Sequence, residues 1–385
     1  MFSFISNHAG KHARRVFFAF ARHILLPAAG LFLLTLCVAC AASGPAENDA
    51  ASAAAQKDRN TLTVLCVDFP EYDWTRSIIG AANSSQPASA SQDKNAKKIV
   101  VQLLNTAGAD MHSYQPTIAD MVKIANCDLL IYNGGASQFW VEDALKAYPN
   151  PDRQVLSLMR LFESEPDRFP TYVQDEDEHE HKEHAHAHSH GEHDHKDETD
   201  EHLWLSLKMS REFCRATASQ LAALNPTAAA AYQASAAAYI QKLDALDGKI
   251  TKLVRQSTCK TLIFADRYPF KYFCDDYGLA HEAAFPGCSA ETEASFETII
   301  SLADDLKALP KSRLVTLDGG SAALAETITR AAELPETQIV TLYSMQSLPQ
   351  TVRALRESGK IQNEREVTYL YLMEQNYESL ARLLS

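Results

Sequence analysis

One long helical pattern in the middle of the chain, residues 226–256, constrains the fold more than any other feature. Asn225 precedes it as a capping residue, and Pro226 stands at the first helical position, where a missing backbone N–H does no harm. Apolar side chains recur at helical spacing from Tyr232 to Leu253. At 1.5 Å per residue such a helix is about 45 Å long. A helix of this length, with strand patterns on both sides, predicts a rigid strut that joins two lobes.

Short apolar runs of the kind found in buried parallel strands flank this helix. They occupy residues 61–67, 98–104, 128–133, 153–158, 261–266, 313–318 and 338–342. Amphipathic segments alternate with them, which is the pattern of helices covering mostly parallel sheets. We therefore expect an α/β fold with an N-terminal lobe over residues 61–225, the linking helix at 226–256, and a C-terminal lobe over 257–385.

Residues 1–40 have the layout of an export signal, with basic residues followed by an uncharged apolar run. The run is short and one-sided for a transmembrane helix. It ends in LCVACAAS, which resembles the lipobox at which bacterial lipoproteins are lipidated on cysteine, although Cys37 stands where leucine is preferred. We expect lipidation at Cys40, with ordinary signal cleavage as the alternative. A diacylglyceryl cysteine carries enough acyl chain for stable anchoring, and residues 41–60 are expected to be a flexible tether.

Most of the formal net charge of −13 comes from residues 175–201, which hold twelve Asp and Glu against two Lys. The rest of the chain is close to neutral, and no basic cluster of the kind that binds nucleic acid is present in the sequence. Besides Cys37 and Cys40 the chain has six cysteines, with no CxxC among them. Export permits disulfides, but this spacing does not imply a disulfide framework, and buried free thiols are expected.

The same acidic segment, 175–201, carries a dense run of histidines. These are His179, His181, His184, His186, His188, His190, His193 and His195. Such a composition cannot pack a core and predicts a mobile loop. Neutral imidazole binds zinc, nickel and copper, and interleaved carboxylates raise the local cation concentration. The run therefore predicts metal capture and favours zinc over manganese; the alternative is a solvated acidic loop without a dedicated role.

His112 lies just beyond the second strand pattern, where parallel sheets place their ligands. At this point the chain resembles the cluster A-I substrate-binding proteins, the metal-binding lipoproteins of bacterial ABC importers for zinc and manganese. The resemblance covers the chain from about residue 62 to its end and is carried by GADMHSYQPTIADM, CDLLIYNGG with FWVEDAL, DEHLWLSL, DRYPFKYFCDDYGL, GCSAETEASFETI and YLYLMEQNYESL. It implies a metal held in a cleft between the two lobes, with His112 and His202 as ligands.

Two further ligand positions depart from the family pattern. Arg267 stands where most members have histidine or glutamate, and Tyr343 stands where an aspartate is usual. Arginine has no lone pair for a cation, whereas zinc prefers four ligands. Asp266 is the first candidate to complete the shell, and an ion pair between Asp266 and Arg267, which would leave an open or weak site, is the alternative. The other candidates are Glu291, Glu293, an ionised Tyr343 and water.

The resemblance implies an extracytoplasmic receptor, monomeric and lipid-anchored to the bacterial cell membrane, that captures zinc and delivers it to an ABC permease driven by its ATPase. In a Gram-negative organism the location would be the periplasm. No enzymatic step is expected. Two alternatives stay open: a surface metal store or adhesin that relies on the histidine run, and a zinc hydrolase, for which no HExxH motif is found in the sequence.

Overall fold

The computed structural model describes residues 61–85, 97–106, 109–169, 199–285, 294–346, 348–363 and 366–385. The export signal with Cys40, the tether, all eight histidines from His179 to His195, and Glu291 and Glu293 lie outside the described residues. No helix in the described part of the chain is both long enough and apolar enough to cross a bilayer.

The first lobe is built on a four-stranded sheet in the order β2-β1-β3-β4, in which all the pairings are parallel. Its strands are β1 (Thr61–Cys66), β2 (Lys98–Leu103), β3 (Leu129–Tyr132) and β4 (Gln154–Ser157). Side chains alternate between the two faces of the sheet. Leu65 and Leu130 pack with the helices on one face, while Val64 and Ile131 belong to the main core on the other. Burial on both faces explains the nearly continuous apolar runs of the sequence.

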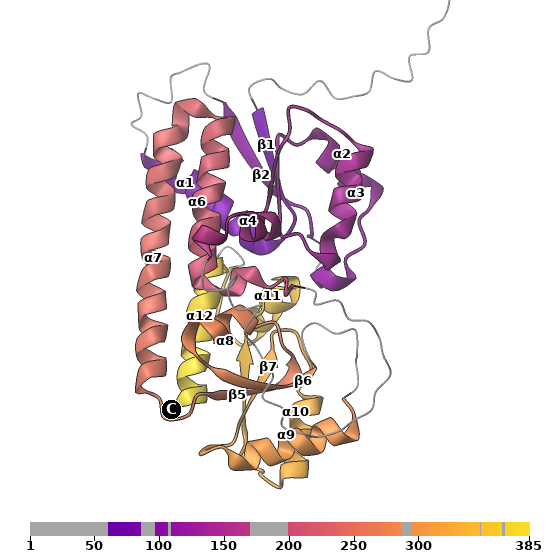
Figure 1. The fold of residues 1–385 in the computed structure, drawn as a ribbon, viewed down its shortest axis with the longest axis vertical. Coiled ribbons are helices and arrows are strands. Elements are labelled where there is room, and N and C mark those ends of the chain that lie inside the picture. The colour runs from indigo at the N-terminus through magenta and orange to yellow at the C-terminus, as the bar shows by residue number, and fades with distance from the viewer. Residues whose placement is uncertain are drawn as a thin grey trace, which may run out of the picture. The chain divides into compact units, whose positions relative to one another are not determined.

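Helices cover both faces of the first sheet (Figure 1). They are α1 (Phe69–Ser85), α2 (Ile118–Asn126), α3 (Phe139–Ala147), α4 (Leu158–Ser164) and α6 (Leu207–Leu224). The core of the α2 and α3 face includes Ile124 and Val141, whereas Trp74 of α1 and Phe213 of α6 pack on the opposite face. Helix α2 begins with a capping box, since Thr117 and Asp120 each accept the other's backbone N–H.

The second lobe is built on a second parallel four-stranded sheet, in the order β6-β5-β7-β8. Its strands are β5 (Thr261–Arg267), β6 (Ala280–Phe285), β7 (Arg313–Leu317) and β8 (Gln338–Leu342). Its helices are α8 (Lys271–Tyr277), α9 (Phe296–Ala308), α10 (Ala323–Ala332), α11 (Leu348–Glu357) and α12 (Tyr369–Leu384). Strand β6 was missed from the sequence because AHEAAF has no β-branched residue and is exposed over its first half. The expected fold class, two parallel-sheet α/β lobes, is confirmed.

The long helix α7 (Ala229–Gln256) follows α6 and leads into β5. It packs on α1 and α6 of the first lobe and on α8 and α12 of the second. It begins three residues later than its sequence pattern predicts, because Pro226–Ala228 form a 3-10 turn instead. Asn225 makes no capping hydrogen bond; its side-chain amide donates to the Tyr232 hydroxyl at 3.1 Å.

Candidate metal centre

His112 lies at the carboxyl edge of the first sheet, on the 3-10 turn η2 (Met111–Ser113) that follows β2. The Asp110 carboxylate accepts a hydrogen bond from the His112 backbone N–H at 2.9 Å and so caps this turn. On the ring, Nδ1 lies 2.6 Å from the hydroxyl of Ser137, which belongs to the segment after β3. Loops at the carboxyl ends of two parallel strands therefore hold this imidazole.

His202 stands just before α6 and is 2% exposed. Its backbone N–H donates to Asp200 Oδ1 at 2.8 Å, and its ring Nδ1 lies 2.9 Å from the same oxygen. A carboxylate oxygen only accepts, so Nδ1 carries a proton, and Nε2 has a lone pair for a metal when the ring is neutral. Burial by itself raises the pKa of Asp200, but the His202 ring and its hydrogen bonds outweigh burial and hold that pKa below its ordinary value.

The two imidazoles meet through their Nε2 atoms, which are 3.3 Å apart. Their ring centroids are 5.3 Å apart, and the ring planes are inclined by 51°. In a tetrahedral zinc site with Zn–N bonds of about 2.0–2.1 Å, two nitrogen ligands lie about 3.3 Å from each other. The pair of His112 and His202 therefore has the spacing of one edge of a zinc tetrahedron.

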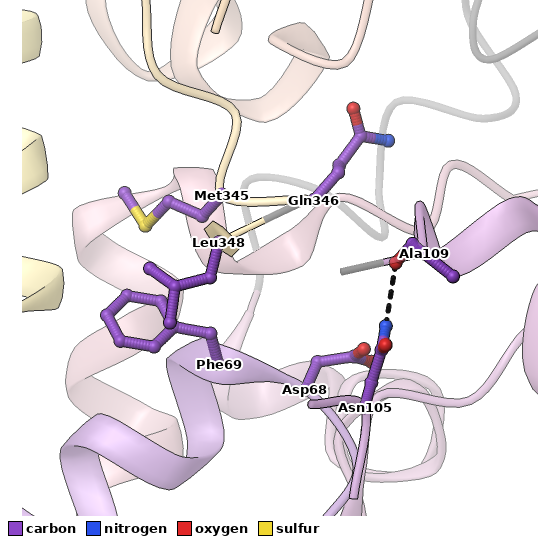
Figure 2. Close-up of a pocket in the computed structure, with 7 residues that line it drawn as sticks. All are labelled: Asp68, Phe69, Asn105, Ala109, Met345, Gln346 and Leu348. Carbon is purple, nitrogen blue, oxygen red and sulfur yellow. Dashed lines mark hydrogen bonds between the residues drawn. The ribbon is translucent and has the colours of Figure 1, made fainter. Parts of the chain in front are cut away.

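A third side chain, Gln346, reaches this pair from the loop that follows β8 in the second lobe. Its amide Nε2 lies 2.8 Å from Nε2 of His112 and 2.9 Å from Nε2 of His202. Figure 2 shows Gln346 and Met345 on one side of a small hollow, and Asp68 of the first lobe on the other side. This contact was not predicted, although the position of Gln346 after a strand of a parallel sheet is one that the strand-end rule singles out.

Glu201 lies behind the His112 ring. Its Oε1 accepts a hydrogen bond from the Ser137 backbone N–H at 2.8 Å, and its Oε2 lies 4.0 Å from Nδ1 of His112. Gly135 passes so close that a Cβ there would lie 2.5 Å from Glu201 Oε1, and its φ is +81°. Only glycine meets both conditions without strain, which explains the second glycine of the NGG motif.

Two buried carboxyl groups follow β1: Asp68, which lines the hollow opposite Gln346, and Glu71, in the first turn of α1. Burial raises the pKa of Asp68 to about 6, against hydrogen bonds led by that from Gln138, which lower it. Burial, and then the charge of Asp68, raise the pKa of Glu71 well above its ordinary value. A nearby cation would favour the ionised form of both groups, so this side of the hollow suits positive charge.

Asp266 lies at the end of β5, as expected, but the structure does not bring it to the imidazoles. Its Oδ1 accepts from the Arg267 backbone N–H at 2.9 Å, and its Oδ2 accepts from the Leu317 backbone N–H at 3.1 Å. The carboxylate thus links β5 to β7. The Arg267 guanidinium pairs with Asp110 of the first lobe, at 3.5 Å, which differs from the ion pair with Asp266 that the sequence suggested.

Tyr343 is also directed elsewhere. Its hydroxyl accepts a hydrogen bond from Lys360 Nζ at 3.2 Å, and the same ammonium lies 5.6 Å from the centre of the ring. Burial raises the pKa of Tyr343, which disfavours the ionised form that a metal would need. Within the described ranges, no three His, Cys, Asp or Glu side chains are grouped closely enough to hold a metal ion. Of the predicted ligands that the structure describes, it therefore brings together His112 and His202.

Comparison with known proteins gives one family match. The profile of the family described as zinc-uptake complex component A, periplasmic (ZnuA), matches residues 88–383. The zinc-binding lipoprotein AdcA of Streptococcus pneumoniae is 25% identical over 319 residues, which are 83% of this chain and 55% of AdcA. The chain thus spans about half the length of that relative. The iron ABC transporter substrate-binding lipoprotein MtsA of Streptococcus pyogenes is 26% identical over 308 residues, or 80% of this chain and 85% of MtsA.

Solved structures share the fold. The crystal structure of the Zn(II)-bound ZnuA-like domain of Streptococcus pneumoniae AdcA matches with a TM-score of 0.58 at 22% identity, and the match covers 84% of this chain and 99% of that domain. At this level of identity the likeness shows that the two proteins share the two-lobed fold.

Proposed function

We propose, since this chain belongs to the ZnuA family of zinc-uptake complex components, that it is an extracytoplasmic solute-binding protein that captures zinc and delivers it to an ABC permease for import. The family match confirms the resemblance inferred from the sequence motifs. The observation that carries the proposal is the pair of imidazole Nε2 atoms, 3.3 Å apart, formed by His112 and His202. Zinc is the cargo of this function, and no covalent bond has to be made or broken.

Hydrogen-bonding groups behind the two rings orient the Nε2 atoms that would bind the metal. The carboxylate of Asp200 fixes the proton of His202 on Nδ1, and Ser137 contacts Nδ1 of His112. Such contacts orient the rings and increase the basicity of the ligating nitrogen. The site is therefore ready to bind a borderline cation that prefers imidazole.

Zinc is favoured over the other metals of the family. Imidazole suits zinc, whereas manganese is a harder ion that prefers carboxylate and water. Relatives named for zinc and for iron both match this chain, and a Mn-bound protein shares its fold. The histidine run from His179 to His195 supports zinc, because it concentrates metals that bind imidazole. We assign this run to the capture of zinc that is then transferred to the pair of His112 and His202.

Delivery requires a membrane partner and an anchor. We propose lipidation at Cys40, a tether over residues 41–60, and a monomeric receptor that docks on a permease powered by an ATPase. The relatives AdcA and MtsA are both named as lipoproteins, and MtsA as a substrate-binding component of an ABC transporter. Release would follow a small rearrangement of the two lobes on docking.

Calorimetric titration of the metal-free chain with zinc tests the proposal, with a variant that lacks residues 175–197 as the comparison. We expect one tight site per chain in both proteins, and several weak sites in the full chain alone. Loss of all binding in the deletion variant would overturn the receptor and support a metal store in which the histidine run is the whole function.

A further inference from the structure

We propose that Gln346 is the second lobe's ligand for the captured cation. Its amide nitrogen lies within hydrogen-bond distance of both imidazoles. A cation bound by the two imidazoles would be faced by the amide oxygen, Oε1, of the same side chain. The inference rests on the proposed metal-receptor function, and it assigns the role left vacant by the substitutions at Arg267 and Tyr343.

The proton on His202 Nδ1 sets the direction of the hydrogen bonds around the two imidazoles. Nδ1 of His202 donates to the Asp200 carboxylate, so its Nε2 accepts. Gln346 Nε2 lies 2.9 Å from this lone pair and 2.8 Å from Nε2 of His112. The amide group has two N–H donors, one for each ring. The amide nitrogen therefore faces the lone pair of His202 and lies against Nε2 of His112, beside the position that a cation bound by both rings would take.

The amide nitrogen and the amide oxygen of Gln346 can exchange places. Rotation by about 180° about the last side-chain torsion of glutamine swaps the two amide atoms, and this torsion is broad and nearly two-fold. In a zinc tetrahedron the ligands are about 3.3 Å apart, whereas the amide nitrogen now lies 2.8 and 2.9 Å from the two rings. The amide of Gln346 has to withdraw by only about half an ångström to make room for the ion.

The main chain that carries Gln346 is held in place by hydrogen bonds to neighbouring residues. Met345 has a φ of +63°, a left-handed conformation that is uncommon outside glycine. Ser344 is held on both sides, because its backbone N–H donates to Asp318 Oδ1 at 2.5 Å and its carbonyl accepts from Trp204 Nε1 at 2.9 Å. Strained backbone that is fixed by its surroundings is often found at functional sites. The loop therefore holds Gln346 against the pair of imidazoles.

The ligand set that results is neutral. Two imidazoles and an amide carry no charge, so the cation is balanced by carboxylates behind the rings, Asp200 and Glu201. A neutral shell binds less tightly than one that contains a carboxylate. This predicts that Gln346→Glu increases the affinity for zinc, while Gln346→Ala, which leaves a position for water, decreases it.

Zinc titration of the metal-free full chain in competition with a chelator tests the inference, since the chelator removes zinc from the weak sites of the histidine run. We expect Gln346→Ala to weaken the tight site by about tenfold to a hundredfold and Gln346→Glu to tighten it by about tenfold. Cobalt(II) provides a second readout, because its visible absorption changes with its ligands. Gln350→Ala, on the exposed part of the same segment, is the matched control and should leave affinity and spectrum unchanged.

The possible outcomes distinguish a failure of the Gln346 assignment from a failure of the proposed receptor function. A tight site in the wild-type chain that is unchanged or tighter in Gln346→Ala would overturn the inference and leave the receptor function intact. Absence of a tight site in the wild-type chain would overturn the receptor function itself. Thermal melting of each variant shows whether it is folded, and a gain of affinity in Gln346→Glu cannot be explained by misfolding.

Discussion

The two lobes use the same structural position for different purposes. In the first lobe, the loop after β2 and the segment before α6 provide imidazoles whose Nδ1 atoms are already engaged by Ser137 and Asp200. In the second lobe, the carboxylate at the end of β5, Asp266, accepts two backbone N–H groups. The first lobe therefore directs two imidazoles at the candidate site, whereas the end of β5 in the second lobe holds its own sheet together.

The two lobes would therefore contribute differently to the proposed metal site. Under the proposed function the first lobe sets the affinity, because it provides both imidazoles of the candidate site. The second lobe contributes a neutral amide, Gln346, and a cation, Arg267, that pairs with Asp110 across the cleft. A second lobe that adds no charged ligand lets the metal leave without separating opposite charges, which suits a protein that has to give up its cargo.

The largest expected effect comes from removing both imidazoles. The double variant His112→Ala, His202→Ala should lose the tight zinc site, a decrease in affinity of more than about a thousandfold, because no nitrogen ligand is left in the cleft. Chelator competition measures it. His281→Ala is the control, since this histidine of β6 stacks on Tyr268, with ring centroids 3.7 Å apart, rather than facing the pair. Full affinity in the double variant would mean that the metal binds elsewhere.

Asp266→Ala separates the two uses of a strand end. Its loss leaves the Leu317 and Arg267 backbone N–H groups without their acceptor, so we expect the free energy of unfolding to fall by about 2–3 kcal/mol. The affinity for zinc should stay within about threefold of the wild-type value, since the carboxylate serves the sheet. Chemical denaturation and zinc titration measure the two quantities. A large loss of affinity at unchanged stability would instead make Asp266 a ligand.

The fold was predictable from the sequence because its central strands, β1, β3, β5 and β7, are largely buried on both faces. Apolar runs located seven of the eight described strands, and β6, which is exposed over its first half, was the one missed. His112 followed from strand-end placement and motif resemblance, and His202 from motif resemblance alone; their roles as ligands stay a prediction. Gln346 also lies after a strand, but its contact with the two imidazoles depends on how the loop after β8 folds back, which no local pattern reveals. The partners of Asp266 depend in the same way on the pairing of β5 with β7, which no local pattern reveals.

Asp200→Asn tests how far the first lobe is prepared in advance. The variant keeps the shape of the side chain but removes the charge that holds the His202 proton on Nδ1. Replacing such a supporting group lowers metal affinity by about tenfold to a hundredfold. We expect a loss in this range from chelator competition, with wild-type thermal stability to within a few degrees. Unchanged affinity would show that the ring is oriented by packing alone, including its contact with Trp204.

The free energy of unfolding at low pH tests the segment that follows the His112 turn, and the expected effect is smaller. Asp120 accepts from Thr117 and from the Tyr114 hydroxyl at 2.9 Å. Burial acts to raise its pKa, but these hydrogen bonds prevail and lower the pKa to about 2. A lowered carboxyl pKa stabilises the fold above the ordinary value near 4, and this contribution is lost as the pH falls toward 2. Asp120→Asn should therefore cost about 1–2 kcal/mol at pH 7 and almost nothing at pH 2, as measured by urea unfolding; an equal cost at both pH values would contradict the assignment.

The smallest effect is expected for the ion pair between the lobes. Arg267 and Asp110 are each about one-third exposed, with side-chain values of 34% and 31%, and their atoms are 3.5 Å apart. Partly exposed pairs of this kind contribute at most about 1 kcal/mol and are screened by salt. Arg267→Gln should therefore change zinc affinity by less than about fivefold at low salt, and the change should vanish in about 1 M salt. A larger effect that persists in salt would mean that Arg267 of the second lobe controls the affinity for zinc. The proposal that the first lobe sets this affinity would then be wrong.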